Sequence, residues 1–301
     1  MNLKKMPYGI SNFEELITEN YYYVDKTKYI EKLENLPEKR IMFLRPRKFG
    51  KTLFTSVLEN YYDKKTEDKF QKLYKDTYIG KNPTKLKNSY CILRFNFSGI
   101  DTSNAESTMK GFKNKTISSI GVFIKKYGLD FYINTQNEAE EILNDLFKAF
   151  YIQKASEKIY VIIDEYDHFA NELLGFNPND FKDLVSKNGK VRKWYETLKE
   201  GTETVVDRIF ITGVAPITLD SLTSGFNIGT DISQDIRFNE MMGFTKEELE
   251  ELLNNQEISK NEQEKILPIM KENYDGYRFN LKAEKQIYNS NMCLFFLSGY
   301  M

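Results

Sequence analysis

Three consecutive residues, Gly50, Lys51 and Thr52, have the types and spacing that suit the binding of a polyphosphate. They follow the apolar run Ile41–Leu44 and open a helix-like stretch, so backbone N–H groups are expected to converge at a helix N-terminus. The glycine lets the backbone approach a phosphate, the lysine amine pairs with its terminal oxygens, and the threonine hydroxyl completes a Mg²⁺ shell. These residues predict a nucleotide-phosphate site.

The loop before them departs from the common form G-x-x-x-x-G-K-T, because Arg45 stands in place of its first glycine. Pro46 favours an extended conformation at Arg45 and supplies no N–H. The loop is therefore expected to close differently, and phosphate binding is expected to depend on the amides from Lys48 to Thr52. An ordinary basic turn before a helix is the alternative. The predicted nucleotide-binding residues are Arg47, Lys48, Phe49, Gly50, Lys51, Thr52 and Leu53.

A second apolar run, Ile159–Ile163, ends in the adjacent acids Asp164 and Glu165 and resembles a Walker B element. We predict that Asp164 is a metal ligand together with Thr52. Glu165 is the predicted catalytic base that orients and deprotonates an attacking water, while Lys51 neutralises developing charge. The alternative is a strand that ends in a solvated acidic turn.

Further polar residues follow strand-like runs. In an ATPase that inserts a strand between its two phosphate-contacting strands, a polar residue at Thr212 reads the γ-phosphate. Thr212 is therefore a candidate catalytic sensor, and a structural strand-end threonine is the equal alternative. Asp167 and His168 are interpreted as local caps or surface hydrogen-bonding residues. The alternatives are that Asp167 supports a metal ligand and that His168 senses phosphate.

The elements that must position these residues alternate between apolar runs and longer helix-like segments. The strand-like runs are Ile41–Leu44, Cys91–Phe97, Ile159–Ile163 and Val205–Ile211. The helix-like segments are Lys51–Tyr61, Glu106–Lys126, Glu138–Tyr151 and Asn179–Lys199. This alternation predicts an α/β fold with a central parallel sheet.

Capping residues predict further helices toward both ends. Ser11 with Glu14 forms an expected capping box, and Asp25 is an expected N-cap. Near the other end, Thr245 with Glu248 predicts a second capping box, and another helix is expected to follow it.

Composition excludes several function classes. The 301 residues include two cysteines and one histidine, which excludes a disulfide framework and thiolate or histidine-rich metal centres. No export signal or membrane-spanning run is visible, so a cytoplasmic protein is expected.

Charge is distributed unevenly although the net charge is -1. Residues 77–129 contain nine cations and two anions. The stretch Lys81–Lys126 is therefore a candidate contact for a nucleic acid or an acidic protein. A solvated helix face is the favoured alternative, because the aromatic residues there follow no RNA-binding pattern.

Several motifs together resemble the AAA-ATPase-like family of P-loop proteins, over about residues 5 to 290. The matching segments are Tyr8–Phe13, Tyr22–Thr27, Arg45–Thr52, Ile163–Asp167, Thr212–Ile217, Gly243–Thr245 and Tyr274–Phe279. The Arg-Pro-Arg loop is usual in that family, so Arg45 is a variant of the motif.

The resemblance implies a three-layer P-loop NTPase fold with a small C-terminal helical extension. It also implies ATP and Mg²⁺ as ligands and hydrolysis as a conformational switch. Asp25, Lys26 and Thr27 would line the adenine or ribose edge, with a helix cap as the alternative. Arg278 from the lid, or Arg237 acting in trans in an oligomer, would reach the γ-phosphate.

The first predicted domain is 1–235, a P-loop domain with an N-terminal helical segment. The second is 236–301, a helical lid or extension that is expected to be truncated before a nuclease-like domain. Members of the family commonly continue into a PD-(D/E)XK nuclease-like domain, whose catalytic residues are not found here, so nuclease activity is not carried over. The apolar run Cys293–Leu297 is interpreted as a joining segment without its packing partner.

Three other functions compete with an ATPase. The first is a nucleotide-gated regulatory binding module with little turnover, and the second is the ATPase component of a nucleic-acid-processing system. The third is a nonfunctional fragment of a longer protein.

Overall fold

A central parallel sheet organises the computed structural model, which describes residues 3–168, 189–216 and 229–300. Within these residues the sheet has five strands in the order β2-β3-β4-β1-β5. They are β1 (Arg40–Leu44), β2 (Cys91–Asn96), β3 (Ile159–Asp164), β4 (Val206–Gly213) and β5 (Thr230–Asp231). All adjacent pairs are parallel. The four predicted strands are confirmed, and β4 lies between β1 and β3.

Each central strand is buried on both faces, which is why its sequence is continuously apolar. In β1, Met42 and Leu44 belong to one hydrophobic core, whereas Ile41 and Phe43 belong to the other. Successive side chains of a strand point to opposite faces, so β1 supplies both cores at once. Helices must therefore cover the sheet on both sides.

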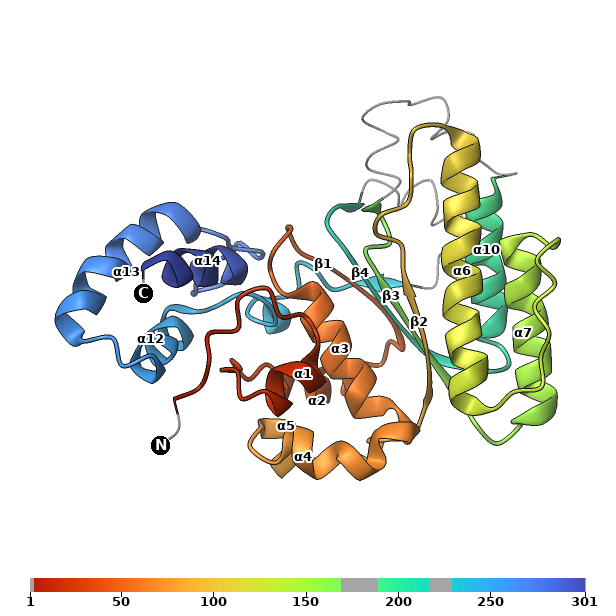
Figure 1. Cartoon of the computed structure of the whole chain (residues 1–301), viewed down its shortest axis with the longest axis horizontal. Helices are drawn as coiled ribbons and strands as arrows, with labels where there is room; N and C mark the ends of the chain where they lie inside the picture. Colours follow the sequence, from red (N-terminus) through yellow and green to blue (C-terminus); the bar gives the residue numbers. More distant parts are fainter. Residues whose placement is uncertain (1–2, 169–188, 217–228, 301) are drawn as a thin grey trace.

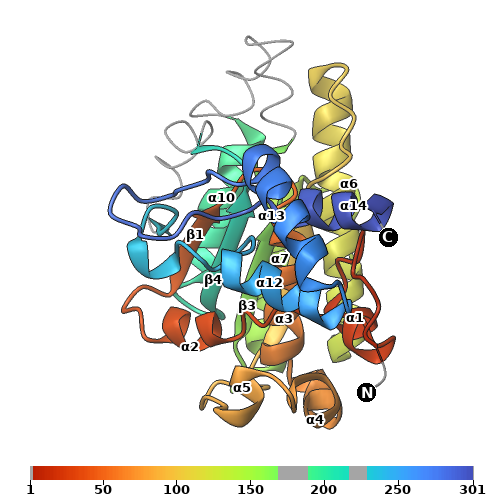
Figure 2. The same ribbon diagram turned by 90° about the vertical axis from the view of Figure 1, so that its left-hand side faces the viewer.

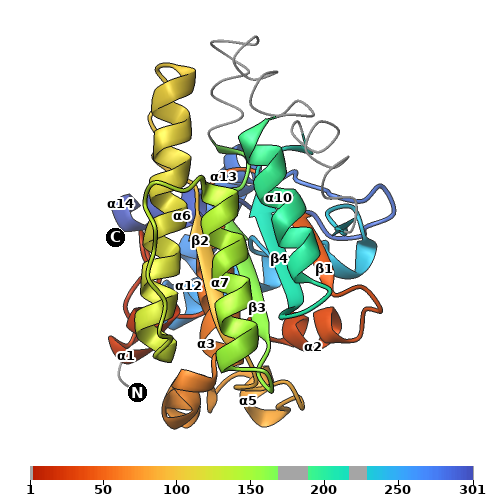
Figure 3. The ribbon, with the colours of Figure 1, turned by 90° about the vertical axis from the view of Figure 1, so that its right-hand side faces the viewer.

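Helices α6 (Ala105–Tyr127), α7 (Ala139–Gln153) and α10 (Lys190–Gly201) cover one face (Figures 1 and 3). Trp194 is fully buried in this layer, with its ring edge-to-face against Phe95 at 4.9 Å between centroids. Such a pair contributes about 0.5–1.5 kcal/mol beyond its burial. The predicted helix Asn179–Lys199 is confirmed from Lys190 onward, and residues 179–188 lie outside the described part of the chain.

The opposite face is covered by α3 and a group of short helices (Figure 1). These are α1 (Phe13–Thr18), α2 (Lys28–Glu34), α3 (Lys51–Tyr62), η1 (Lys64–Lys69), α4 (Phe70–Tyr74) and α5 (Tyr78–Lys81). Together with the sheet and the first helical layer they make a three-layer α/β/α arrangement.

Two predicted caps in this layer are wrong. The N-cap of α1 is Asn12, whose Oδ1 accepts from the Glu15 N–H, rather than Ser11. Asp25 does not cap α2 directly, because its Oδ1 accepts from the N–H and hydroxyl of Thr27. The first error arises because the neighbouring residues Ser11 and Asn12 both carry side-chain oxygens that can accept at an N-cap. In the second case Asp25 forms a turn with Thr27 one step before the helix.

The C-terminal elements pack beside the three-layer arrangement and form a third hydrophobic core (Figure 2). They are η3 (Ile236–Phe238), α12 (Lys246–Asn255), α13 (Lys260–Tyr274) and α14 (Ser290–Tyr300). The predicted capping box of Thr245 and Glu248 is confirmed at α12. The expectation that Cys293–Leu297 lacks a packing partner is wrong, since Cys293 and Leu297 in α14 are fully buried in this core, although Phe295 is exposed. Its role as a joining segment stays a prediction.

The predicted boundary between two domains at residue 235 stays a proposal. Phe238, Met241 and Met242 belong to the core under the sheet and not to the third core. Conversely, Tyr22 and Val24 of the N-terminal segment pack against the third core. The two parts therefore share packing on both sides of that boundary.

Candidate functional site: a cavity at the edge of the parallel sheet

The loop between β1 and α3 turns through two residues with left-handed backbone. Lys48 has φ +71°, and Gly50, the N-cap of α3, has φ +87°. The glycine accepts this conformation without steric cost, whereas Lys48 adopts it under strain. Helix α3 then begins at Lys51, so the predicted strand, loop and helix are all present.

Arg45 explains how the loop closes without its first glycine. Its N–H donates to the Gly213 carbonyl, extending the β1·β4 ladder by one residue. Its guanidinium is 1% exposed and lies between two aromatic rings, 3.9 Å from the Phe43 centroid and 3.8 Å from that of Phe279. It also donates to the carbonyls of Leu44, Ser233 and Phe238. Burial lowers the pKa of Arg45 to about 9.

The Lys51 amine lies inside the loop and close to the acidic strand end. Nζ donates to the carbonyls of Arg45 and Pro46, at 3.0 Å each. Burial lowers the pKa of Lys51. Three carboxylates oppose that shift through their negative charge: Glu165, Asp164 and Asp167. The loop and the acids, more than a hundred residues apart in sequence, thus meet at one edge of the sheet.

Asp164 is fully buried at the end of β3. Its Oδ2 lies 3.5 Å from Nη2 of Arg94, which also donates to the Thr55 hydroxyl at 3.1 Å. Its Oδ1 accepts no hydrogen bond within the described residues. A buried carboxylate oxygen without a donor is costly, so this atom is an available acceptor for a bound cation or water.

Glu165 follows at φ +51°, a strained conformation for a residue with a side chain. Asp167, two residues on, is fully buried and accepts from the N–H groups of Val214 and Ala215. Asp167 thus caps N–H groups 47 and 48 residues away and is buried, so its interpretation as a local cap or a surface hydrogen-bonding residue is wrong. This cap ties the turn after β3 to the turn after β4.

Gly213 permits that close approach. A β-carbon there would lie within 2.5 Å of Cδ1 of Tyr166 and would overlap Oδ1 of Asp167. We expect Gly213→Ala to lower the free energy of unfolding by about 1–3 kcal/mol, as overpacking does. Chemical denaturation measures the change.

The matched control is Gly121→Ala inside α6, where a β-carbon would meet no described atom within 4 Å. This change should raise the free energy of unfolding by about 0.5–1 kcal/mol, because alanine is the better helix former. Equal effects at the two glycines would contradict the packing described here.

Thr212 is fully buried, and its hydroxyl donates to the Phe43 carbonyl at 2.9 Å. It is not among the described residues that line the cavity. The hydroxyl thus joins β4 to β1, which is the structural alternative weighed for this residue. A sensor role for Thr212 stays a prediction that requires the hydroxyl to leave this bond.

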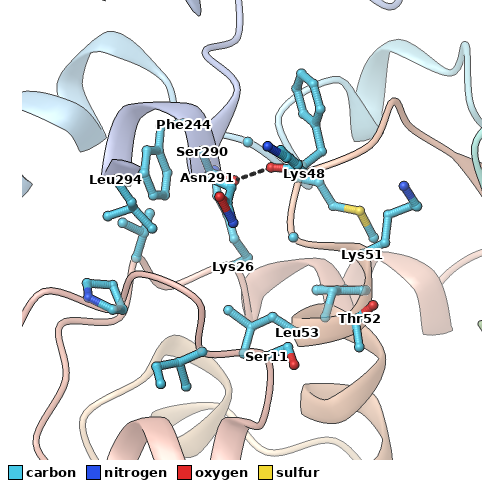
Figure 4. A pocket seen from close by; sticks show the side chains of 18 of the residues that line it. Ser11, Lys26, Lys48, Lys51, Thr52, Leu53, Phe244, Ser290, Asn291 and Leu294 are labelled. Carbon is cyan, nitrogen blue, oxygen red and sulfur yellow. Dashed lines mark hydrogen bonds between the residues drawn. The ribbon is translucent and has the colours of Figure 1, made fainter. Parts of the chain in front are cut away.

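A cavity of about 400 Å³ opens beside the loop (Figure 4). The predicted nucleotide-binding residues Arg47–Leu53 all line it, together with Glu165. Figure 4 shows Ser290 and Asn291 of α14 beside Lys48. Apolar side chains from three chain segments line the rest: Ile10, Leu16, Val24, Met241, Phe244, Leu252 and Leu294.

Of the residues proposed for the adenine or ribose edge, only Lys26 is among the described residues lining the cavity. Its amine is buried and pairs with Glu248 of α12 at 2.6 Å. The charge of Lys26 is therefore balanced by the C-terminal part of the chain.

Neither predicted arginine is among the described residues that line the cavity. Arg237 pairs with Asp235 on its own turn, and Arg278 is exposed. A role for either toward a γ-phosphate stays a prediction.

The donor set fits a cation that is shared with a polyphosphate. The described residues contain no cluster of three or more His, Cys, Asp or Glu side chains that could hold a metal alone. Mg²⁺ is usually held by one or two protein ligands, with phosphates and water completing its shell. Thr52 lines the cavity, and its hydroxyl fits that pattern. Asp164 is not among the described residues that line the cavity, so its role as a metal ligand stays a prediction.

The cationic stretch Lys81–Lys126 is only partly available to a partner. Lys126 pairs with Asp63 at 2.5 Å and with Glu59 at 3.3 Å. Lys110 and Lys125 are exposed on α6. Binding of a nucleic acid or an acidic protein there stays a prediction. No helix in the described ranges has the length and hydropathy needed to cross a membrane.

A family model described as "Predicted AAA-ATPase" matches residues 7–223, which is well over half of the sequence. The chain belongs to this family. The predicted family resemblance is thereby confirmed, and so is the P-loop NTPase-like three-layer fold. The match covers β1 to β4, the loop and the acidic strand end, whereas α12, α13 and α14 lie beyond it.

A curated relative from Azotobacter chroococcum mcd 1, described as an uncharacterized protein in the vnfD 5' region, is 26% identical over 255 residues. The alignment covers 83% of this chain and 45% of the relative, so the chain spans less than half of that protein's length. No solved structure matches the chain.

Sequence reasoning missed the part of the cavity that comes from the C-terminal elements. Met241, Met242, Gly243, Ser290, Asn291 and Leu294 all line it. The Asn289-Ser290 pair is a recognisable helix-start signal, which would have predicted α14 itself. Nothing in the sequence pattern indicates that this helix begins against the phosphate loop.

Proposed function

We propose that this member of the family binds ATP with Mg²⁺ in the cavity and hydrolyses it. One observation carries the proposal: the Lys51 amine and the acids Asp164 and Glu165 gather at the carboxyl ends of β1 and β3, with β4 between them. Ligands of open parallel sheets bind at that edge. The family description, a predicted AAA-ATPase, supports ATPase activity as a general class.

The phosphates are proposed to bind at the start of α3. The amides that precede this helix and its N-terminal dipole favour an anion. Lys51 would exchange part of its bonding to the Arg45 and Pro46 carbonyls for phosphate oxygens. The exposed side chains of Arg47 and Lys48 add positive charge at the cavity mouth.

Hydrolysis is proposed to use Glu165 as the base. A water attacks the γ-phosphorus in line, its proton passes to the Glu165 carboxylate, and the bond to the leaving ADP oxygen breaks. Lys51 stabilises the charge that develops on the transferred group. When bound, Mg²⁺ neutralises charge on the β- and γ-phosphates, and Thr52 and Asp164 would hold it.

The apolar part of the cavity suits the base and sugar. It is contributed by the N-terminal segment, by residues 241–244 and by helices α12 and α14. Because Ser290 and Asn291 of α14 line the same cavity as the phosphate loop, hydrolysis is proposed to act as a conformational switch that moves the C-terminal helices.

Calorimetric titration of the purified chain with ATP tests the proposal. We expect binding in the micromolar range with Mg²⁺ and at least about tenfold weaker binding with EDTA, since the unshielded triphosphate then faces buried Asp164. Phosphate release measured in parallel reports turnover. Absence of ATP binding in either condition would overturn the proposed function.

The same measurements separate the rival functions. Tight ATP binding without phosphate release in a single-turnover experiment supports the nucleotide-gated regulatory module. Phosphate release that DNA stimulates at low salt but not at high salt supports a nucleic-acid-processing ATPase, because phosphate contacts weaken steeply with ionic strength. The cytoplasmic location and an oligomeric state stay predictions.

A further inference from the structure

Donors from the C-terminal part of the chain hold three consecutive carbonyls of the phosphate loop. Asn289 Nδ2 donates to the Arg47 carbonyl at 3.1 Å. The Lys48 carbonyl accepts from the Ser290 hydroxyl at 3.3 Å (Figure 4). It also accepts from the Asn291 N–H at 3.2 Å. The Gly243 N–H donates to the Phe49 carbonyl at 3.2 Å. We call this set of contacts the loop latch.

The loop latch fixes the direction of the amides predicted to bind phosphate. In a trans peptide unit the carbonyl of one residue and the N–H of the next point in opposite directions in one plane. Holding the carbonyls of residues 47, 48 and 49 therefore orients the N–H groups of Lys48, Phe49 and Gly50. These are amides of the segment to which the sequence assigns phosphate binding.

Side-chain contacts strengthen the same junction. The Phe49 ring is edge-to-face with Tyr277 at 4.8 Å and with Phe279 at 5.5 Å between centroids. Phe279 also stacks on the Arg45 guanidinium at the start of the loop. The loop is thus held by the hydrogen bonds of the latch and by two aromatic residues of segment 274–279.

Asn289 occupies the centre of the loop latch. Besides its donation to Arg47, its Oδ1 accepts from the Met292 N–H at the first turn of α14, at 3.3 Å. Its own N–H donates to the Tyr274 carbonyl at the end of α13. One side chain, 7% exposed, therefore joins the phosphate loop to the start of α14.

We propose that Asn289, with Ser290, is a positioning residue that couples nucleotide binding at the loop to the position of α14. The inference rests on the proposed function, because it concerns the same loop. Phosphates that order the loop amides also order the carbonyls that the latch holds. Coupling between two sites is reciprocal, so ATP stabilises the α14 junction to the extent that the junction favours ATP.

The variant Asn289→Ser tests the coupling. Serine remains a good helix N-cap but is too short to reach the Arg47 carbonyl. We expect ATP affinity to fall about fivefold, which is the effect of one lost hydrogen bond. In hydrogen exchange, saturating ATP should slow exchange of residues 286–300 in the wild type, and this slowing should be lost in Asn289→Ser.

The matched control is Ser259→Ala, which removes the N-cap of α13 without touching the loop. It should retain both wild-type ATP affinity and the ATP-dependent protection of residues 286–300. A merely structural effect of a lost cap would appear in both variants, whereas the coupling is lost only in Asn289→Ser.

The outcomes separate this proposal from the proposed function. If the wild type binds ATP and Asn289→Ser matches it in ATP affinity and in protection from exchange, the coupling through the loop latch is overturned. The proposed ATP site then remains intact. Wild type that does not bind ATP overturns both. If Asn289→Ser does not fold, Ser290→Ala removes only the hydroxyl bond to the Lys48 carbonyl. The same loss of protection is then expected, and full protection overturns the proposal.

Discussion

Lys51→Ala is expected to abolish ATP binding. The amine is buried in the loop, with its positive charge facing the cavity that Arg47–Leu53 line. A hydrogen bond between charged groups contributes about 1.5–3 kcal/mol, so two lost phosphate contacts weaken binding roughly 100-fold or more. Calorimetric titration with Mg²⁺ and ATP measures the change.

Two controls accompany this variant. Lys110→Ala removes an exposed cation of α6, distant in sequence from the loop, and should leave ATP affinity unchanged. Circular dichroism checks that Lys51→Ala remains folded, because the substitution leaves the Arg45 and Pro46 carbonyls without this donor. Unchanged ATP affinity in folded Lys51→Ala would show that the cavity is not the phosphate site.

Glu165→Gln should preserve ATP binding but reduce turnover at least about 100-fold, the lower range of general-base catalysis. The amide has nearly the same shape as the carboxylate but cannot take the proton of the attacking water. Single-turnover phosphate release at saturating ATP measures the chemical step separately from binding.

Glu203→Gln is the matched control, since Glu203 is exposed after α10 and is not among the residues lining the cavity. It should hydrolyse ATP at the wild-type rate. Turnover by Glu165→Gln equal to that of wild type would reject the assigned base. Tight binding with no turnover in any variant, wild type included, would favour the regulatory binding module.

The sheet and the centre of the site could be predicted because they depend on local patterns. Continuous apolar runs identify strands buried on both faces, and the carboxyl ends of parallel strands meet at one edge. That rule is sufficient to place Lys51 near Asp164 and Glu165 without knowledge of any other contact. The position of β4 between β1 and β3 agrees with the predicted inserted strand.

The remaining parts of the site depend on packing that no local pattern encodes. Asn289 reaches Arg47 across 242 residues of sequence. Thr212 has the right residue type for a sensor, but its hydroxyl bonds to a neighbouring strand. Asn12 caps α1 instead of Ser11, because adjacent residues with similar acceptors are indistinguishable by propensity alone.

Arg45 shows that a loop that departs from the consensus can still be closed and firmly packed. This position holds a long side chain with a planar cation instead of glycine. The guanidinium lies between Phe43 of the sheet and Phe279. Replacing Arg45 with the consensus glycine would remove the side chain that lies between Phe43 of β1 and Phe279 of the C-terminal part of the chain. Searches that demand glycine at this place would therefore overlook proteins built on the same principle.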